Sequence, residues 1–256
     1  RDKLIPTTET YNVGIRTYER MAEPEKAQRL LSDLIRRSDL DPSRKLKPNS
    51  ESFALVIRAW LGVADMGSKN ALETAVRWLD SLAEIEKRET GVVSMIDLYT
   101  GVLRAARSCA AKYPEALDIA VETIDKLRAS RHMVNGLHYS RLLQTGLFAM
   151  SRSEHNDVRT AFITQIVEDC SEDGLITTPL LRALANGPVY YDGRTIEGSD
   201  RLTEKLFPDW PLPHGWTRNV KQVGHIPRRT DLMRTGFDLV RHGDDPYKNT
   251  FYKADK

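Results

Sequence analysis

Apolar residues recur along residues 5–186 with the spacing of amphipathic α-helices. Four segments begin with an aromatic residue, which is followed by apolar or small residues three, four and seven positions later. This spacing places the four side chains on one face of a helix. The four aromatic residues are Tyr11, Phe53, Tyr99 and Tyr139. They are separated by 42, 46 and 40 residues, so the pattern predicts a repeated structural unit.

A second helical pattern follows each aromatic segment. These second patterns begin near Ala27, Ala75, Leu117 and Val158. Pro24 and Pro114 lie near the start of two of them, where the missing N–H of proline costs little. The unit is therefore a helix–turn–helix hairpin of about 40 residues. The sequence contains four such hairpins, and a partial fifth is expected from Leu175 to the Asn186-Gly187-Pro188 break.

Hairpins of this kind cannot bury their apolar faces alone, so they stack on their neighbours. We therefore expect an all-α fold, an α-solenoid of stacked helix-turn-helix repeats over residues 5–186. The alternative is a non-repetitive helical bundle with chance aromatic positions, but the shared register of the four segments argues against it. From Gly187 the helical periodicity is largely lost. Residues 187–256 are expected to be an irregular, partly basic C-terminal extension.

The charge distribution limits the kind of ligand. The net charge is +2, and residues 1–186 sum to about zero while residues 214–256 carry about +4. A protein that bound nucleic acid through bulk charge would carry a larger basic excess. The balance argues against tight non-specific binding, and it is compatible with modules that each contact one base. No apolar stretch approaches the roughly 18 residues of a membrane span, so no membrane partner is expected.

The sequence offers little catalytic chemistry. Cys109 and Cys170 lack the spacing of a zinc site or a redox pair, which favours buried free thiols and a reducing compartment. Walker, GxGxxG, HExxH, GxSxG and zinc-deaminase motifs are absent. Asp244-Asp245 is a possible Mg²⁺ pair, but a Gly-Asp-Asp-Pro sequence is typical of a turn. The C-terminal histidines, which lack a metal-site spacing, are His214, His225 and His242. We expect neither enzymatic activity nor a cofactor.

Three segments resemble pentatricopeptide repeats. Residues 6–15, PTTETYNVGI, resemble the opening of such a repeat, with its Thr-Tyr-Asn-x-x-Ile signature. Residues 47–57, KPNSESFALVI, are similar to the junction and opening of the next repeat, and residues 25–31, EKAQRLL, resemble the second-helix pattern. The likeness covers about residues 5–186. Residues 212–220, LPHGWTRNV, resemble the tail that closes such arrays in a divergent algal branch of the family.

The resemblance implies a protein that binds single-stranded RNA, with about one base recognised per repeat by two or three side chains. In the family, the residue after the helix-one aromatic contacts the base together with a residue from the following junction. The implied residues are Asn12 with Asn49, Ala54 with Met95, Thr100 with Asn135, and Ser140. Amides and hydroxyls donate and accept hydrogen bonds, whereas the second pair would discriminate poorly. Relatives act in mitochondrial or plastid RNA processing, stability or translation, which implies an organelle.

Three arginines extend the expected interface. Arg16, Arg58 and Arg104 each lie five residues after the aromatic residue of their helix, one turn beyond the base-contacting residue and on the same face. A row of guanidinium groups would suit phosphate contacts. Gln144 breaks the row in the fourth unit.

Structural roles compete with each of these assignments. Asparagine, threonine and serine near helix starts are often caps or solvated residues. Exposed arginines on helices are often ion-pair partners, and the tyrosines are better suited to packing between helices than to stacking on bases. The rival function is a protein-interaction scaffold like a tetratricopeptide array, which shares the hairpin architecture. It is favoured by the neutral charge of residues 1–186.

Overall fold

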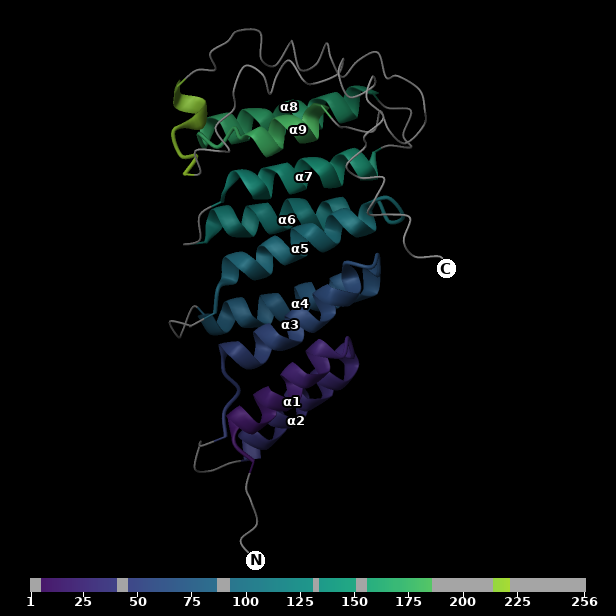
Figure 1. Cartoon of the computed structure of the whole chain (residues 1–256), viewed down its shortest axis with the longest axis vertical. Helices are drawn as coiled ribbons and strands as arrows, with labels where there is room; N and C mark the ends of the chain where they lie inside the picture. Colours follow the sequence, from purple (N-terminus) through teal and green to yellow (C-terminus); the bar gives the residue numbers. More distant parts are fainter. Residues whose placement is uncertain are drawn as a thin grey trace, which may run out of the picture. The chain divides into compact units, whose positions relative to one another are not determined.

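A computed structural model describes residues 6–40, 46–86, 93–130, 134–150, 156–185 and 214–221, and the regular secondary structure in these ranges is helical (Figure 1). The prediction of an all-α fold is confirmed. The helices are α1 (Thr8–Arg20), α2 (Pro24–Leu40), α3 (Ser50–Ala64), α4 (Lys69–Glu86), α5 (Met95–Ala110), α6 (Ala116–Ala129), α7 (Gly136–Ala149), α8 (Asn156–Glu172), α9 (Thr178–Ala185) and the 3₁₀-helix η2 (His214–Thr217). The four aromatic segments form α1, α3, α5 and α7, called leading helices below. The segments that follow them form the trailing helices α2, α4, α6 and α8.

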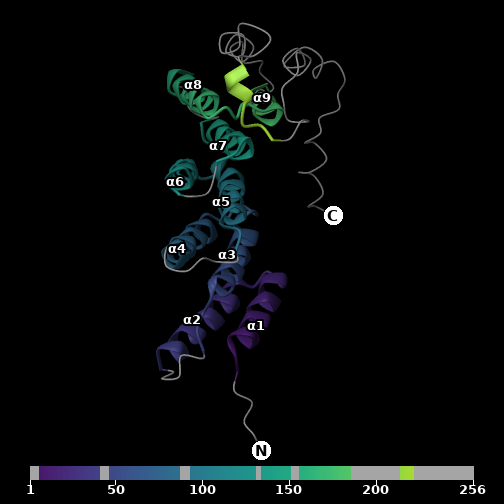
Figure 2. The ribbon, with the colours of Figure 1, turned by 90° about the vertical axis from the view of Figure 1, so that its left-hand side faces the viewer.

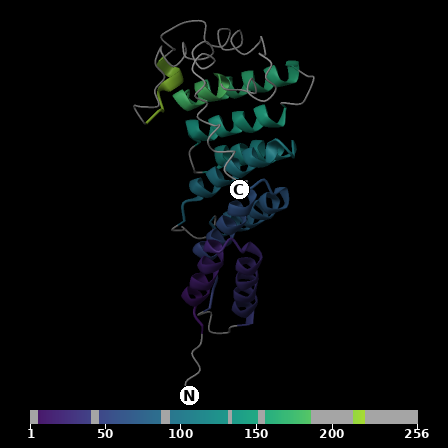
Figure 3. The same ribbon diagram turned by 45° about the vertical axis from the view of Figure 1, so that its right-hand side comes forward.

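The helices fall into two compact units, α1–α6 and α7–α9 with η2. In the first unit, each trailing helix packs against the leading helix of its own hairpin. The leading helices also contact one another, α1 with α3 and α3 with α5. Figures 2 and 3 show α3 beside α5, and Figure 2 shows α4 and α6 together on one side of them. Consecutive hairpins of this unit are therefore joined through their leading helices.

The predicted domain boundaries stay predictions. Residues 186–213 and 222–256 lie outside the described ranges. Most of the predicted C-terminal extension therefore lies outside the part of the chain that the structure describes. Within the segment that was expected to form a partial fifth hairpin, the structure describes one helix, α9.

Polar residues at the junctions begin the leading helices. The N-caps, whose side chains accept a backbone N–H of the first turn, are Thr7, Asn49, Ser94 and Asn135. In α1, α3 and α7 the third helical residue also bonds back to the backbone of the cap, which completes a capping box. One such cap contributes about 1 kcal/mol to stability. Asn49 and Asn135, which the family resemblance assigns to RNA contact, therefore have a structural role in the folded chain.

The four recurring aromatic residues are buried inside the hairpins. Between 1% and 8% of each residue is exposed. The Tyr11 hydroxyl donates to Asp33 Oδ2 of α2 at 2.7 Å, and the Tyr139 hydroxyl donates to Asp173 beyond the end of α8. Phe53 packs against Trp78 of α4, with 5.9 Å between ring centroids. The packing interpretation of these tyrosines is confirmed, because rings that are buried between helices are not free to stack on bases.

Gln28 connects the first two hairpins. Its Oε1 accepts the indole N–H of Trp60 in α3 at 2.9 Å and that of Trp78 in α4 at 3.1 Å. An indole N–H that is shielded from water and lacks an acceptor would be destabilising. The single amide oxygen of Gln28 supplies an acceptor to both indoles. It ties α2 to the neighbouring hairpin on the trailing side.

In the second unit, residues 214–221 close the end of α8. The side chain of Arg218 donates to the carbonyl of Glu172, and Asn219 Nδ2 donates to the carbonyl of Asp173 at 2.7 Å. The backbone N–H of Asn219 donates to the Gly174 carbonyl at 2.9 Å. These donors satisfy carbonyls at a helix C-terminus that lack partners within the helix. The described part of the predicted closing tail therefore packs on α8.

Gly174 permits this contact for two reasons. Its φ is +66°, which is a left-handed conformation that favours glycine. A Cβ at this position would also lie 2.8 Å from the carbonyl oxygen of Gly215 in η2. A larger residue would therefore strain the helix end and displace the tail.

The packing of α7 on α8 predicts opposite effects at two helical glycines. A Cβ at Gly146 would lie 2.0 Å from the ring of Phe162, whereas a Cβ at Gly62 would meet nothing within 4 Å. We expect Gly146→Ala to lower the free energy of unfolding by about 1–3 kcal/mol through overpacking. Gly62→Ala is the control and should raise it by about 0.5–1 kcal/mol, because alanine favours the helix. Urea denaturation followed by circular dichroism measures both, and a Gly146→Ala protein as stable as the wild type contradicts the packing.

His138 predicts a dependence of stability on pH. Its ring is buried, and Nδ1 accepts the backbone N–H of Asn135 at 3.1 Å. Burial, and to a lesser degree the charge of Arg141, lowers the pKa of His138 to about 4. The unfolded chain binds this proton near a pKa of 6.5, while the folded chain resists it until about 4. Stability is therefore lost as the pH falls from about 6.5 to about 4.

The variant His138→Gln isolates this effect. Glutamine keeps an acceptor at the third helical position, as in common capping boxes, but does not titrate. We expect the wild type to lose up to about 3 kcal/mol more stability than the variant between pH 7 and pH 4. Denaturation curves collected across this range test the difference. Parallel pH profiles would show that the His138 ring does not resist protonation.

Candidate nucleic-acid interface

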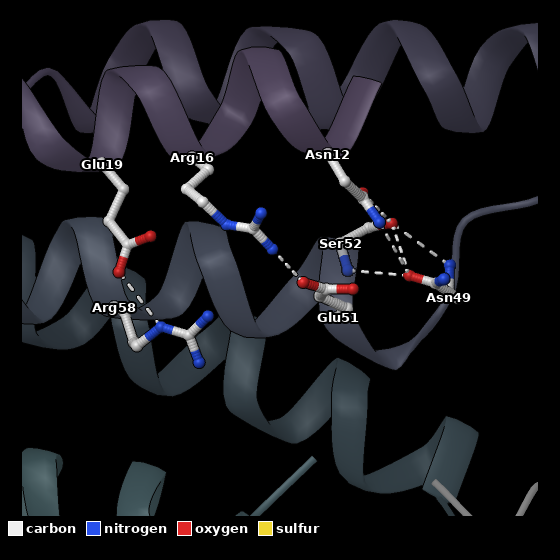
Figure 4. Close-up of polar contacts among 7 residues, drawn as sticks. All are labelled: Asn12, Arg16, Glu19, Asn49, Glu51, Ser52 and Arg58. Atoms are coloured by element: carbon white, nitrogen blue, oxygen red, sulfur yellow. Dashed lines mark hydrogen bonds and ion pairs between the residues drawn. The ribbon is translucent and has the colours of Figure 1, made fainter. Parts of the chain in front are cut away.

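The first predicted base-contacting pair meets at the contact between α1 and α3. Asn12, in the second turn of α1, donates from Nδ2 to Asn49 Oδ1 at 3.3 Å (Figure 4). The Ser52 hydroxyl lies between them and is 2.7 Å from Asn12 Oδ1 and 2.9 Å from Asn49 Oδ1. Residues 37 positions apart are thus joined in one hydrogen-bonded group, called the amide cluster below.

The junction before α3 is held on α1 by a second contact. The Thr8 hydroxyl donates to the Lys47 carbonyl at 2.9 Å and accepts the Lys47 N–H at 3.3 Å. Asn49 then has an extended backbone, with φ −118° and ψ 172°, before the helix begins. These local restraints position the Asn49 side chain beside Asn12.

The amide cluster is only partly accessible. Asn12 is 5% exposed and Ser52 is fully buried, whereas Asn49 is exposed. Both polar atoms of the Asn12 amide are engaged within the cluster. A ligand at this point would therefore meet Asn49 first, with Asn12 behind it.

Each of the three predicted arginines forms an ion pair between hairpins. Arg58 Nε in α3 donates to Glu19 Oε1 in α1 at 3.0 Å. Arg104 Nε in α5 donates to Asp65 Oδ2 at the end of α3 at 2.8 Å. Arg16 in α1 is paired with Glu51 in the first turn of α3 (Figure 4).

The three ion pairs are accessible to solvent. The arginine side chains are 43%, 44% and 53% exposed in chain order. Exposed pairs of this kind contribute about 0–1 kcal/mol each. The arginines thus lie on the leading helices as predicted, but the row is neutralised by carboxylates of the neighbouring hairpins.

Two other residues that were predicted to contact RNA form hydrogen bonds within the protein. Thr100 is half-buried, and its hydroxyl donates to the Ile96 carbonyl at 2.7 Å. Ser140 is 3% exposed and donates to the Pro179 carbonyl in α9 at 3.3 Å. Asn135 is exposed at the start of α7. Thr100 and Asn135 belong to different units, so their pairing stays a prediction.

The second predicted pair is buried. Ala54 is 0% exposed and Met95 is 2% exposed, so both belong to the core of the first unit. The expectation that the pair would discriminate poorly among bases stays a prediction.

Four residues at this interface were missed by the sequence interpretation: Ser52, Glu19, Glu51 and Asp65. Ser52 lies three residues after Asn49, and this spacing is a capping-box signal that could have identified it. The three acids carry no local signal. Each meets an arginine that is 35 to 39 residues away, so the pairing depends on how the helices pack.

The described residues contain no group of three or more His, Cys, Asp or Glu placed to hold a metal ion. Residues Asp244, Asp245, His225 and His242 and the side chain of His214 lie outside the described part of the chain. Cys109 and Cys170 are buried thiols that are not joined in a disulfide, as predicted. Burial raises the pKa of Cys109 to about 11, so its nucleophilic thiolate is scarce at neutral pH.

The helices of the described ranges are all too short or too polar to traverse a lipid bilayer. Comparisons with protein-family models, with curated proteins and with solved structures found no match for this chain. The similarity to pentatricopeptide repeats therefore rests on the motifs in the sequence.

The amide cluster predicts energetic coupling across the α1–α3 contact. We expect Asn12→Ala and Ser52→Ala each to destabilise the first unit, because each leaves a buried polar partner unsatisfied. The double variant should lose less than the sum of the two, with a coupling of about 0.5–1.5 kcal/mol. The control is Ser81→Ala in α4, whose hydroxyl bonds to the Arg77 carbonyl of the same helix. Its effect should add to that of Asn12→Ala, and urea denaturation measures all five variants.

Proposed function

We propose that the hairpins of this chain stack as an α-solenoid that binds single-stranded RNA without catalysis. The observation that carries the proposal is the meeting of Asn12 and Asn49 where two leading helices are in contact. Recognition of one base by two side chains from successive hairpins requires that they lie at one point. Their 37-residue separation makes this an outcome of hairpin packing.

The positions of the arginines support RNA binding at the same contact. Arg16 and Arg58 follow the amide cluster along the contact between α1 and α3 (Figure 4). The bases of a strand along this contact would face Asn49, and its phosphates would face the guanidinium groups. Ion pairs worth at most about 1 kcal/mol each present a small barrier to such phosphate contacts.

The biological setting follows from the pentatricopeptide resemblance. We propose a role in mitochondrial or plastid RNA processing, stability or translation, in which a few repeats serve within a larger ribonucleoprotein.

A protein-interaction scaffold is the second candidate function. The observation that favours it is the pairing of each of the three predicted arginines with a carboxylate, which neutralises the charge of the arginine row. A surface of alternating charges suits a polar protein partner better than a polyanion.

Measurement of RNA affinity separates the two candidates. A labelled pool of random single-stranded RNA is titrated with the protein at about 50 and about 200 mM salt. We expect Arg16→Gln/Arg58→Gln to bind more weakly than the wild type and to lower the slope of log affinity against log salt by up to about 1.4. This change corresponds to two lost phosphate contacts.

Two lysines provide a matched control. Lys69 pairs with Glu115 and Lys126 pairs with Asp80, and both pairs connect hairpins on the trailing side. Lys69→Gln/Lys126→Gln removes the same charge and should leave RNA affinity within about twofold of the wild type. An equal loss in both variants would indicate bulk charge. A wild-type protein that binds no RNA at the lower salt would reject the RNA function and leave the scaffold.

A further inference from the structure

Two carboxylates pair with arginines at the proposed RNA contact. Glu19 and Glu51 lie at the same contact as the amide cluster, and each holds an arginine of the neighbouring helix (Figure 4). The two pairs run in opposite directions, because α1 supplies the arginine of one and the acid of the other. Each of the two helices therefore contributes one arginine and one glutamate to the contact.

We propose that Glu19 and Glu51 are internal competitors for Arg16 and Arg58, and that RNA phosphates displace them from the guanidinium groups when the chain binds. The inference rests on the proposed RNA function. It assigns the two acids as residues that set RNA affinity, in addition to any contribution they make to stability.

The exposure of the partners favours exchange at the arginine. The Arg58 side chain is 44% exposed, whereas that of Glu19 is 23% exposed. In Figure 4 the dashed line to Glu19 ends on Nε of Arg58, and the two terminal nitrogens lie beyond it. A guanidinium has five N–H donors in a planar fork. An incoming phosphate can therefore bind the outer donors before the carboxylate leaves.

The geometry at Arg16 gives a different route to the same exchange. Arg16 and Glu51 are 43% and 46% exposed, so both partners are open to solvent. Glu51 also lies in the first turn of α3, where the helix dipole stabilises a negative charge without the arginine. When Arg16 binds a phosphate instead, the carboxylate of Glu51 is therefore still stabilised by the start of α3.

This competition reverses the usual effect of disrupting an ion pair. Removal of the acids should strengthen RNA binding, because the arginines then meet the phosphates without first losing a partner. Two exposed pairs correspond to a gain of about twofold to thirtyfold in affinity for Glu19→Gln/Glu51→Gln. The affinity is measured with the labelled random RNA pool at a fixed salt concentration.

Two comparisons separate competition from simple repulsion between acids and RNA. Asp80→Asn/Glu115→Gln removes the same charge from the ion pairs of the trailing side and should change affinity by less than about twofold. In a protein that already carries Arg16→Gln and Arg58→Gln, neutralisation of Glu19 and Glu51 should give no gain. Thermal unfolding of each variant verifies that the fold is retained, and the single variants Glu19→Gln and Glu51→Gln replace the double variant if it unfolds.

Each remaining outcome decides against the proposal. A gain that persists without the arginines would mean direct repulsion, and equal gains on the leading and trailing sides would mean bulk charge. RNA binding by the wild type that is unchanged in Glu19→Gln/Glu51→Gln would overturn the competition while the RNA function stood. Absence of RNA binding by the wild type and by all variants would overturn both.

Discussion

Direct contact between consecutive leading helices is the constraint on which the interface of the first unit depends. Because α1 touches α3 and α3 touches α5, residues of these helices and their caps meet residues 35 to 40 positions away. The trailing helices pack on the other side of the leading helices, where Gln28 accepts hydrogen bonds from the indoles of Trp60 and Trp78. If a trailing helix lay between two leading helices, neither the amide cluster nor the ion pairs would form.

The same contact gives several residues two roles. Asn49 caps α3 and is also the most exposed member of the amide cluster. Ser52 completes the capping box and also binds Asn12. A junction that must begin a helix already requires a short polar side chain with an extended backbone. Such a side chain is also suited to contact a base, so structural and ligand-binding roles do not exclude each other here.

Much of the fold was predictable because its signals are local. The 3,4,7 spacing after Tyr11, Phe53, Tyr99 and Tyr139 is decided within two turns of a helix, and all four residues are buried as that spacing requires. The meeting of Asn12 with Asn49 was also anticipated, through the family resemblance. A prediction of this kind depends on the repeat register, which the aromatic residues define.

The remainder could not be predicted, because it depends on how helices rotate against each other. Arg58 pairs backwards with Glu19, whereas Arg16 pairs forwards with Glu51, although both arginines occupy the same position in their repeats. Ser140 is buried because α9 packs on α7, and no local pattern around Ser140 reports this. Hydrophobic periodicity and capping residues identify the helices, but the packing of the helices determines which partner each exposed charge meets.

The two parts of the α1–α3 contact differ in what a ligand must disrupt. Separation of Asn12 from Ser52 would leave buried polar groups unsatisfied, at a cost of about 1–3 kcal/mol for each group. Opening of an exposed ion pair costs about 1 kcal/mol or less. A strand that bound here would therefore replace the ion pairs and leave the amide cluster intact. Base discrimination would then rest on the exposed amide of Asn49, with Asn12 and Ser52 fixing its orientation.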